Sequence, residues 1–465
     1  MIFSEAQVEL SNWSKSARST CHVYRVSDVA GIARALAAAR EHRLTVIPHG
    51  AGHSYTDAAL NTGGVVIDVT PMHRILAWDA RTGVMRVEPG VTLREMVQMA
   101  WKDGWWPAVS PSTPEVTIGG CAAMNVNGRN AWKCGPMGDH ILALDVLFAN
   151  GEARTLEPER DAQLFHAFIG SLGLLGIITA ITVQLQRISS GYITLRRRPA
   201  ASLDEIFDLF SLEESDSDFM EAWLDGFARG AQLGRGHITC ATLNTAGAAA
   251  APSPYPAPGV PGRLEIALID LAASLGRPWL LPGMHMLNRG MLWWDHPATG
   301  QPRPLVPYTW WPPAAFAWYH AMFPQGVETF QAFVPRPQAK EIFRQVLRYS
   351  QEQGCLPVWC VIKQHRCDAF LLSYQVDGFS LELNYQRTAQ NAQKLKGVLQ
   401  YMIATVIAAG GRFYLAKDHF LTHAQYRQSV GSEVVDAFLQ LKQHCDPENL
   451  LQSDLYRRVF QPAPG

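Results

Sequence analysis

Two segments rich in glycine and small hydroxyl residues have the composition of loops that bind an anion. The first is His49–Ala59, with the sequence HGAGHSYTDAA. Its two closely spaced glycines let the backbone turn so that successive N–H groups point at one anion, with hydroxyls beside them. The second is Ser110–Gly128, SPSTPEVTIGGCAAMNVNG, where paired glycines again permit close backbone approach. A single loop of this kind is more often a plain turn, so the second segment strengthens the interpretation.

The elements around the first loop narrow the kind of site. A strand-like run, Leu44–Pro48, precedes the loop and another, Val65–Val69, follows it, with no long helix between them. A dinucleotide-binding βαβ unit needs its helix directly after the glycines. We therefore expect a nucleotide site of a different architecture.

The two loops resemble those of the FAD-binding domain of the vanillyl-alcohol oxidase (PCMH-type) superfamily. Within it the chain is most similar to the decaprenylphosphoryl-β-D-ribose 2′-oxidase family, from about residue 20 to about residue 460. The shared motifs are Ser54-Tyr55…Asp57, Val116–Gly120, Asn127-Gly128…Asn130, Gly173–Ile178, Gly410–Asp418 and Asp446–Asp454. The resemblance implies that the cofactor is FAD. The residues expected to bind it are Gly50, Ala51, Gly52, His53, Ser54, Tyr55, Asp57, Ser112, Thr113, Thr117, Gly119, Gly120, Cys121, Asn125, Asn127, Ile178 and Tyr414.

His53 is where the chain departs from the ribose-oxidase branch. Its position matches the histidine that is bonded covalently to the flavin in the aldonolactone oxidase branch. The alternative is a histidine that only donates a hydrogen bond beside the cofactor. A covalent FAD and a non-covalent FAD are both open at this point.

The resemblance also implies where the reaction takes place. Oxidation of an alcohol needs a hydride acceptor within about 3–3.5 Å of the carbinol carbon and a group that accepts or stabilises the hydroxyl proton. Lys417 matches the active-site lysine of the ribose oxidases, while Glu382 replaces a pocket cysteine and would serve as a general base. Gln331 and Lys363 fall on positions that line the sugar pocket together with Lys417, and the alternative is an edge strand that exposes them to water. Trp132 or Ala131 replaces a family histidine, and Trp132 would contact the substrate and narrow the pocket.

The implied activity is an FAD-dependent oxidation of a hydroxyl group of a sugar, sugar-lipid or polyol to a carbonyl. The substrate would be a small molecule or a lipid-linked sugar, and the electron acceptor, oxygen or a quinone, stays open. One alternative is an aldonolactone or alditol oxidase that produces hydrogen peroxide. Others are a flavin-dependent reductase of carbon–carbon double bonds and, least favoured, a non-catalytic flavin-binding subunit.

Composition limits the other functions of the chain. Its 465 residues, 48% hydrophobic and 17% charged, fit a two-domain globular protein, and a net charge of −1 argues against nucleic-acid binding. Neither the eight cysteines nor His419 and His423 have the spacing of a metal site. We see no signal peptide and no membrane-spanning run, which favours the cytoplasm, with peripheral membrane contact left open.

Patterning predicts an α+β protein of two domains. The FAD-binding domain takes residues 1–190 and is completed by residues 405–465, while residues 191–404 form a largely antiparallel substrate domain. In the first part we predict a helix over Gly31–Arg40, a capping box of Thr92 with Glu95, and a hairpin about Asn150-Gly151. The predicted strands are Val65–Val69, Val84–Glu88, Ile177–Leu185, Glu221–Asp225, His237–Cys240, Thr329–Val334, Pro357–Lys363, Phe370–Gln375 and Ser380–Tyr385.

Two segments of the substrate domain have unusual composition. Asn244–Gly262 is rich in alanine, proline and glycine, which predicts a mobile loop. Met284–Phe323 is crowded with aromatic residues. We expect these rings to pack in the core, with a wall that covers the substrate or faces lipid as the alternative. The tryptophans concerned are Trp293, Trp294, Trp310, Trp311 and Trp318.

Overall fold

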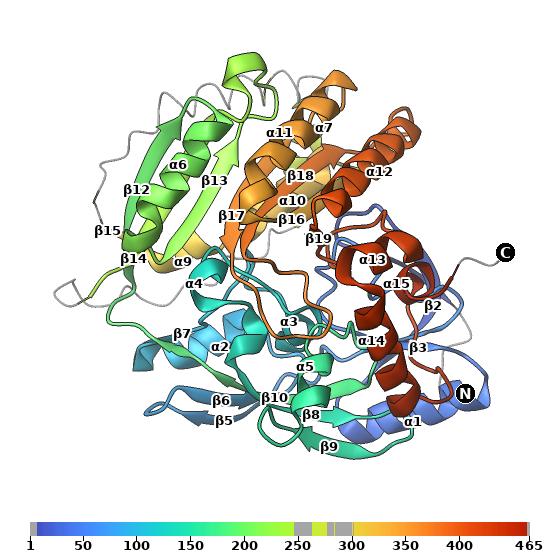
Figure 1. The fold of residues 1–465 in the computed structure, drawn as a ribbon. Coiled ribbons are helices and arrows are strands. Elements are labelled where there is room, and N and C mark those ends of the chain that lie inside the picture. The colour runs from blue at the N-terminus through green and yellow to red at the C-terminus, as the bar shows by residue number, and fades with distance from the viewer. Residues whose placement is uncertain (1–6, 246–262, 277–282, 284–299, 301, 463–465) are drawn as a thin grey trace.

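The computed structural model describes all residues except 1–6, 246–262, 277–282, 284–299, 301 and 463–465. It confirms the predicted α+β architecture, with a four-stranded, a five-stranded and a two-stranded sheet (β7, Trp105–Trp106, with β11, Gln186–Arg187) in the N-terminal part and a large sheet in the following part (Figure 1). The predicted mobile segment, Asn244–Gly262, lies almost entirely outside the described residues. Trp293 and Trp294 lie outside them as well.

The N-terminal part begins with a four-stranded sheet in the order β1-β2-β4-β3. Its strands are β1 (Val8–Ser11), β2 (Arg18–Arg25), β3 (Val46–His49) and β4 (Val65–Asp68). β2 and β3 both run parallel to β4, and the predicted helix α1 (Val29–Glu41) lies between them in sequence. Asp28 caps this helix by accepting a hydrogen bond from Gly31 N–H, and Ile32 and Leu36 are buried.

A five-stranded antiparallel sheet follows, in the order β5-β6-β10-β8-β9. Its strands are β5 (Ile75–Asp79), β6 (Val84–Val87), β8 (Ile141–Leu147), β9 (Ala153–Leu156) and β10 (Ile177–Gln184). The predicted capping box at Thr92 and Glu95 and the predicted hairpin of β8 and β9 are both confirmed. The other elements of this part are α2 (Leu93–Ala100), η1 (Trp101–Asp103), β7 (Trp105–Trp106), α3 (Ile118–Met124), α4 (Ala131–Cys134), η2 (Met137–His140), α5 (Ala162–Phe168) and β11 (Gln186–Arg187).

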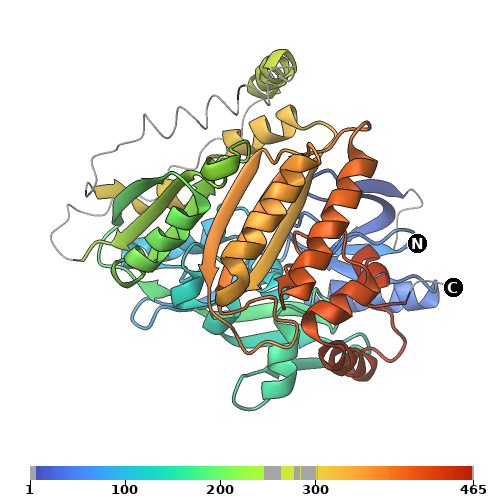
Figure 2. The ribbon, with the colours of Figure 1, turned by 45° about the horizontal axis from the view of Figure 1, so that its top comes forward.

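The second part is built on an eight-stranded sheet in the order β15-β12-β14-β13-β17-β18-β16-β19, with every pair antiparallel. Its strands are β12 (Tyr192–Ala200), β13 (Phe219–Leu224), β14 (Gly236–Leu243), β15 (Pro302–Pro304), β16 (Val327–Pro335), β17 (Trp359–His365), β18 (Gly378–Gln386) and β19 (Arg412–Phe413). Helices α6 (Leu203–Glu213), α11 (Arg336–Glu352) and α12 (Ala392–Ala408) cover one face, as Figure 2 shows. The central strands β16 and β18 are buried along almost their whole length, so both of their faces are covered.

One predicted strand is wrong. Phe370–Gln375 forms turns and loop, because local side chains take up its backbone donors. Asp368 accepts from Phe370 N–H and Ser373 Oγ accepts from Gln375 N–H, each at 3.1 Å. The segment instead reaches the N-terminal part, where the Tyr374 hydroxyl donates to Asn125 O at 2.6 Å.

The C-terminal tail connects both parts. β19 adds an edge to the large sheet beside β16. The helices α13 (His423–Val430), α14 (Ser432–Cys445) and α15 (Asp454–Val459) follow, and Leu451, between α14 and α15, bridges to Val46 of the first sheet. The tail therefore holds the loop region of the N-terminal part against the large sheet.

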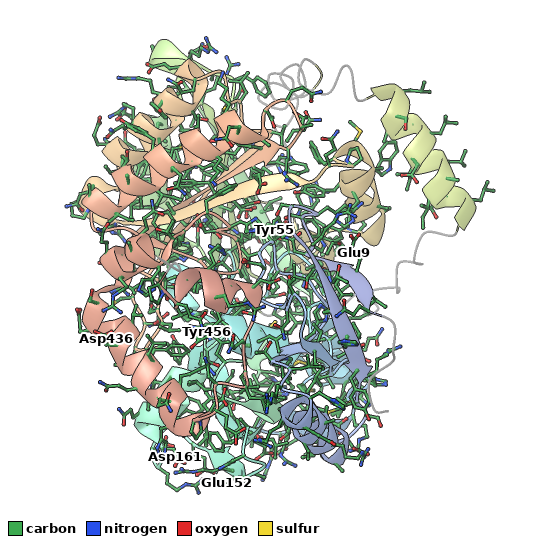
Figure 3. All side chains as sticks on the ribbon, turned by 90° about the vertical axis from the view of Figure 1, so that its right-hand side faces the viewer. Glu9, Tyr55, Glu152, Asp161, Asp436 and Tyr456 are labelled. Carbon is green, nitrogen blue, oxygen red and sulfur yellow. The ribbon has the colours of Figure 1, made fainter. Side chains whose placement is uncertain are left out.

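The remaining helices flank the large sheet. They are η3 (Glu214–Asp216), η4 (Gly230–Gln232), α7 (Arg263–Gly276), α9 (Leu305–Thr309) and α10 (Pro313–Met322). α7 stands at the edge of the molecule and packs on α10 through Ile269 and Ala273 (Figure 3). No helix among the described residues is long and apolar enough to cross a bilayer.

Candidate active site

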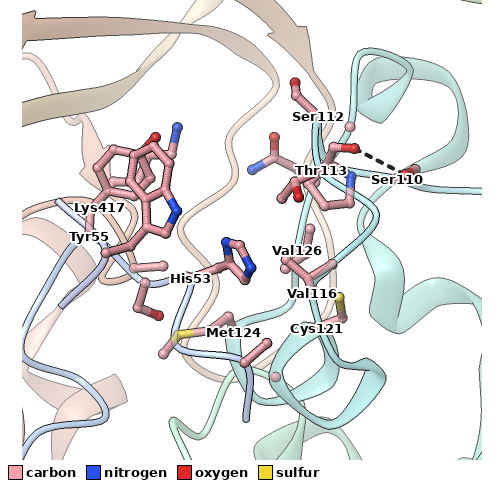
Figure 4. A pocket seen from close by; sticks show the side chains of 18 of the residues that line it. His53, Tyr55, Ser110, Ser112, Thr113, Val116, Cys121, Met124, Val126 and Lys417 are labelled. Atoms are coloured by element: carbon pink, nitrogen blue, oxygen red, sulfur yellow. Dashed lines mark hydrogen bonds between the residues drawn. The ribbon is translucent and has the colours of Figure 1, made fainter. Parts of the chain in front are cut away.

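A cavity of about 780 Å³ lies between the loops of the N-terminal part and the large sheet. Residues from both glycine-rich segments line it, and we call these two segments, residues 49–57 and 110–128, the cofactor loops. Side chains of β13, β16, β17 and β18 line it too, together with Lys417 from the tail. Figure 4 shows His53, Tyr55 and Lys417 facing Ser112, Thr113 and Cys121 across this space.

The first cofactor loop is fixed by hydrogen bonds to distant segments. Tyr55 N–H donates to Ala416 O at 2.8 Å, and Thr56 Oγ1 donates to Leu415 O at 2.8 Å. In contrast, the backbone N–H groups of Ala51, Gly52 and His53 have no acceptor among the described residues. Gly52 has a φ of +70°, which favours glycine. Three adjacent free donors on a rigid loop form a concave anion site.

The second cofactor loop begins the short helix α3. Gly119 N–H donates to Pro89 O at 2.9 Å, and a Cβ at Gly119 would lie 2.7 Å from Pro89 Cβ. A Cβ at Gly50 would lie 2.2 Å from the Thr117 hydroxyl, so the first loop needs glycine where it approaches the second. The Thr117 hydroxyl is buried and has no hydrogen-bond partner among the described residues. An acceptor or donor on a ligand would satisfy this hydroxyl.

These observations fit FAD, whose diphosphate needs backbone donors and close approach rather than bulky side chains. Most of the predicted cofactor residues line the cavity: Gly50, Ala51, Gly52, His53, Ser54, Tyr55, Ser112, Thr113, Thr117, Gly119, Gly120, Cys121, Asn127, Ile178 and Tyr414.

Two predicted cofactor residues do not line it, because their side chains are used elsewhere. Asp57 is buried and pairs with Arg458 at 2.6 Å, so it ties the first loop to the tail. Asn125 ends α3 with a φ of 47°, and its Oδ1 accepts a hydrogen bond from Gly138 N–H at 2.9 Å. Both residues support the loops and do not face the cofactor space.

His53 faces the cavity as a neutral imidazole. Burial lowers the pKa of His53 to about 4, and the nearby Glu115 carboxylate opposes this only in part. At pH 7 both an unprotonated ring nitrogen and a ring N–H are present. Such a ring is able to act as a nucleophile or to form a hydrogen bond with a cofactor.

The sheet contributes a row of side chains directly opposite one another on neighbouring strands. Trp223 of β13 pairs with Val361 of β17, which pairs with Glu382 of β18, which pairs with Gln331 of β16. All four line the cavity. Because alternate residues of a strand share a face, Glu221 and Lys363 lie on the same face, and we call Glu221, Gln331, Lys363, Glu382 and the adjoining Lys417 the cavity floor.

A buried ion pair stands at the centre of the floor. Lys417 Nζ lies 2.6 Å from Glu382 Oε1 and 4.9 Å from the centre of the Tyr55 ring. Burial opposes ionisation of Glu382, but Lys417 and Lys363 outweigh it, so the pKa of Glu382 lies below its ordinary value of 4.5. Burial lowers the pKa of Lys417 from 10.5, against the effect of Glu382. Glu382 is therefore held as a carboxylate beside Lys417. Asn384 Nδ2 also donates to Glu382 Oε1, at 3.3 Å.

A second charged group in the floor was missed by the sequence analysis. Glu221 lies 3.0 Å from Arg129 Nε and 3.7 Å from Lys363 Nζ, and it accepts a hydrogen bond from Trp223 Nε1 at 2.8 Å. A glutamate inside the apolar run Phe219–Leu224 was the available signal, because a charge in a core strand needs a partner.

Aromatic residues enclose the rest of the cavity. Tyr319 stacks on Trp359 with centroids 5.0 Å apart, and Trp223 stacks on Trp311 at 5.9 Å. Trp310 is buried against Trp106. Within the described residues, the aromatic stretch thus both packs in the core, as predicted, and covers the cavity, through Trp311 and Trp318.

Trp132 does not line the cavity, contrary to the prediction that it narrows the pocket. It lies on α4 and packs against the hydrophobic core. Arg129, three residues earlier, lines the cavity and pairs with Glu221.

Comparison with known proteins defines the class. Residues 21–157 match the family of FAD binding domains. The matched region contains both cofactor loops, and the protein is therefore an FAD-binding flavoprotein oxidoreductase with a domain of the PCMH type.

Individual relatives extend this result. The chain is 28% identical to decaprenylphosphoryl-beta-D-ribose oxidase of Mycolicibacterium smegmatis, over 98% of each chain. It is 32% identical to D-lactate dehydrogenase of Anaerostipes hadrus over 33% of this chain and 34% of that protein. It is also 28% identical to L-gulonolactone oxidase of Mus musculus, over 40% of this chain and 42% of the relative.

Proposed function

We propose that this flavoprotein oxidises a hydroxyl group of a sugar, sugar-lipid or polyol to a carbonyl. The observation that carries the proposal is the buried Lys417–Glu382 pair, 2.6 Å apart, at the floor of the cavity that the cofactor loops border. A donor with a CH–OH group needs both a proton acceptor and a group that tolerates alkoxide character, and this pair supplies both. The similarity to a sugar oxidase over 98% of the chain supports the same class of donor.

FAD, when bound, supplies the hydride acceptor for such a reaction. Glu382, as a carboxylate, accepts the hydroxyl proton of the substrate. Lys417 then stabilises the negative charge that develops on the substrate oxygen, since an ammonium acts strongly where water is excluded. Two stacked ring pairs, Tyr319 with Trp359 and Trp223 with Trp311, line the same cavity.

Neutral polar groups orient the substrate. Gln331 and Tyr319 line the cavity, and the Gln331 Oε1 and Tyr319 hydroxyl atoms have no hydrogen-bond partner among the described residues. Buried polar atoms are normally paired, so these two groups are the ones we assign to substrate hydroxyls. A polyhydroxylated substrate is the chemistry that fits them.

The experiment is anaerobic mixing of FAD-loaded protein with a panel of sugars and polyols, followed by the bleaching of the flavin absorbance. The Glu382→Gln variant should keep its FAD but bleach about 10²- to 10⁴-fold more slowly with the best alcohol. Glu328→Gln is the matched control, because Glu328 is a buried glutamate of the same sheet that pairs with Arg387 at 3.2 Å and does not line the cavity. Equal bleaching rates in Glu382→Gln and Glu328→Gln would contradict the proposed role.

An aldonolactone or alditol oxidase that produces hydrogen peroxide is the second candidate. The cavity-facing His53 and the similarity to L-gulonolactone oxidase favour it. Peroxide formed in air with an alditol or aldonolactone would support this candidate, whereas reoxidation by a quinone without peroxide would support a dehydrogenase. Bleaching by NADPH alone would indicate a reductase.

The state of His53 has a direct test. A covalent bond to the flavin keeps the protein pellet yellow after acid precipitation, and His53→Ala should then give a colourless pellet. A non-covalent cofactor leaves the wild-type pellet colourless as well. The neutral imidazole, with its pKa of about 4, is compatible with either arrangement.

A further inference from the structure

Five charged side chains line the cavity among the described residues: Arg129, Glu221, Lys363, Glu382 and Lys417. Three are cations and two are carboxylates, so the difference, 3 − 2, leaves an excess of one positive charge. The charges form two groups. Lys417 and Glu382 balance each other at 2.6 Å, while Arg129 and Lys363 share the single carboxylate of Glu221.

Glu221 is built into this arrangement as an ionised group. It is only 4% exposed, and both carboxylate oxygens are engaged, Oε1 by Arg129 and Trp223 and Oε2 by Lys363. Burial opposes its ionisation, but Arg129 and Lys363 outweigh this and hold the pKa of Glu221 below its ordinary value. The two cations beside it are therefore largely compensated before any ligand binds.

The groups left free to bind a ligand in the same cavity are neutral. Gln331 Oε1 and the Tyr319 hydroxyl lack partners among the described residues. Neutral donors and acceptors suit hydroxyl groups, whereas phosphate and carboxylate are bound by uncompensated Arg or Lys.

One excess positive charge also matches the reaction better than it matches an anionic substrate. An alcohol is neutral when it binds and gains negative charge on oxygen as its proton leaves. An excess cation then favours the transition state over the bound substrate. A phosphate or carboxylate of a substrate would pair with the excess positive charge as soon as the substrate binds. That charge would then stabilise the bound substrate as well as the transition state.

We propose that Glu221 sets the charge of the cavity and so selects an uncharged, hydroxyl-bearing substrate portion over one that carries a phosphate or carboxylate. This inference rests on the proposed function and narrows its substrate class. Glu221 acts through Arg129 and Lys363, and it is a specificity-determining residue.

The test measures the affinity of FAD-loaded protein for inorganic phosphate through the change in flavin absorbance, without turnover. Glu221→Gln raises the excess to two positive charges and should bind phosphate about 10- to 100-fold more tightly than the wild type, from the Coulomb energy at protein dielectric. The rate of bleaching with gluconate, relative to sorbitol, should rise by a similar factor. The cofactor charge is the same in both proteins and cancels from the comparison.

Three further variants separate charge from packing. Glu221→Gln combined with Lys363→Met returns the excess to one and should bind phosphate as weakly as the wild type. Lys363→Met alone leaves no excess, keeps Glu221 paired with Arg129, and should bind phosphate more weakly than the wild type, which decides the question even where Glu221→Gln folds poorly. Glu213→Gln removes a buried carboxylate that pairs with Arg196 and Arg198 outside the cavity, and it should match the wild type.

If folded, FAD-loaded Glu221→Gln bound phosphate with an affinity within twofold of the wild type, this inference would be overturned and the proposed function would stand. A double variant that bound phosphate as tightly as Glu221→Gln would overturn the inference in the same way. If no alcohol of any charge bleached the flavin, the proposed function would fail instead, because the phosphate titration does not depend on catalysis.

Discussion

The cofactor loops and the cavity floor face the same cavity but are built from different parts of the chain. The loops present backbone: three free N–H groups at residues 51–53 and glycines that leave no room for a Cβ. The floor presents charged side chains from three strands and the tail, held by ion pairs at 2.6–3.7 Å. A shape that backbone creates is disturbed by added atoms, whereas a charge arrangement is disturbed by a removed charge. The two regions should therefore respond to opposite kinds of substitution.

The largest effect is expected in the floor, from Lys417→Met. The proposed loss is about 10²- to 10⁴-fold in turnover, with FAD content unchanged. Without Lys417, only Lys363 and Asn384 offset the burial of Glu382, and the pKa of Glu382 rises. The carboxylate form is active, so activity falls as pH drops through that pKa, and the acid limb of the pH–rate profile should move to higher pH than in the wild type.

Lys133→Met is the matched control for Lys417→Met, because Lys133 is an exposed lysine that pairs with Asp218 outside the cavity. Its acid limb should overlay that of the wild type. If the acid limb of Lys417→Met matched that of the wild type, Lys417 would have no effect on the pKa of Glu382.

The next effect concerns the anchor of the first loop, Asp57→Asn. Removing one partner of the buried Asp57–Arg458 pair should cost about 3 kcal/mol in the free energy of unfolding at pH 7. Burial opposes the ionisation of Asp57, but Arg458 outweighs it and lowers its pKa. A lowered pKa gives stability that is complete above the unfolded value of 3.8 and is lost as pH falls through the folded pKa. The gap between variant and wild type should therefore close in acid, as urea unfolding at several pH values would measure.

The exposed pair of Arg427 and Asp436 provides the comparison for Asp57. Asp436→Asn should leave the unfolding midpoint unchanged, because exposed ion pairs contribute little. Equal destabilisation by the two substitutions would show that burial of the Asp57 pair is irrelevant.

Whether an interaction is local or joins distant parts of the chain also determined which features could be predicted from the sequence. The capping box at Thr92 and the glycine spacing of the loops are local patterns that act within a few residues. The capping box is confirmed, and the glycines line the cavity. Most strands of the large sheet were also found, since their apolar runs are local. Asp57 and Asn125 carried the right motif, but their side chains are used by Arg458 and Gly138, which no local pattern specifies.

The floor depends on register between strands that are distant in sequence. Glu221 and Lys363 meet only because β13 pairs with β17, and Lys417 reaches Glu382 from the tail. On strands buried on both faces, alternation of polar and apolar residues is lost, so the single charge within an apolar run was the only sequence signal for Glu221. The false strand at Phe370–Gln375 has the same origin, because its apolar residues pack in a loop closed by Asp368 and Ser373.

A third prediction adds atoms to the second loop. Gly119→Val should weaken FAD binding by about 1–3 kcal/mol, since the new side chain overlaps Pro89 and displaces the start of α3. FAD retained after gel filtration, or the affinity of refilled apoprotein, would measure the loss. Gly397→Ala is the control in a helix with open space around it, and it should bind FAD normally and be slightly more stable. Normal FAD binding by Gly119→Val would contradict the backbone description of the loops.

The smallest effect tests whether the neutral groups of the cavity contact substrate. Tyr319 is 9% exposed, and its hydroxyl has no partner among the described residues. Tyr319→Phe removes that hydroxyl and keeps the ring stacked on Trp359, so thermal stability should not fall. If the hydroxyl binds a substrate hydroxyl, KM should rise about 3- to 10-fold, which corresponds to about 0.5–1.5 kcal/mol, with kcat nearly unchanged. A fall in kcat at constant KM would instead place Tyr319 with the Lys417–Glu382 pair, and the division between a charged floor for chemistry and neutral groups for recognition would not hold.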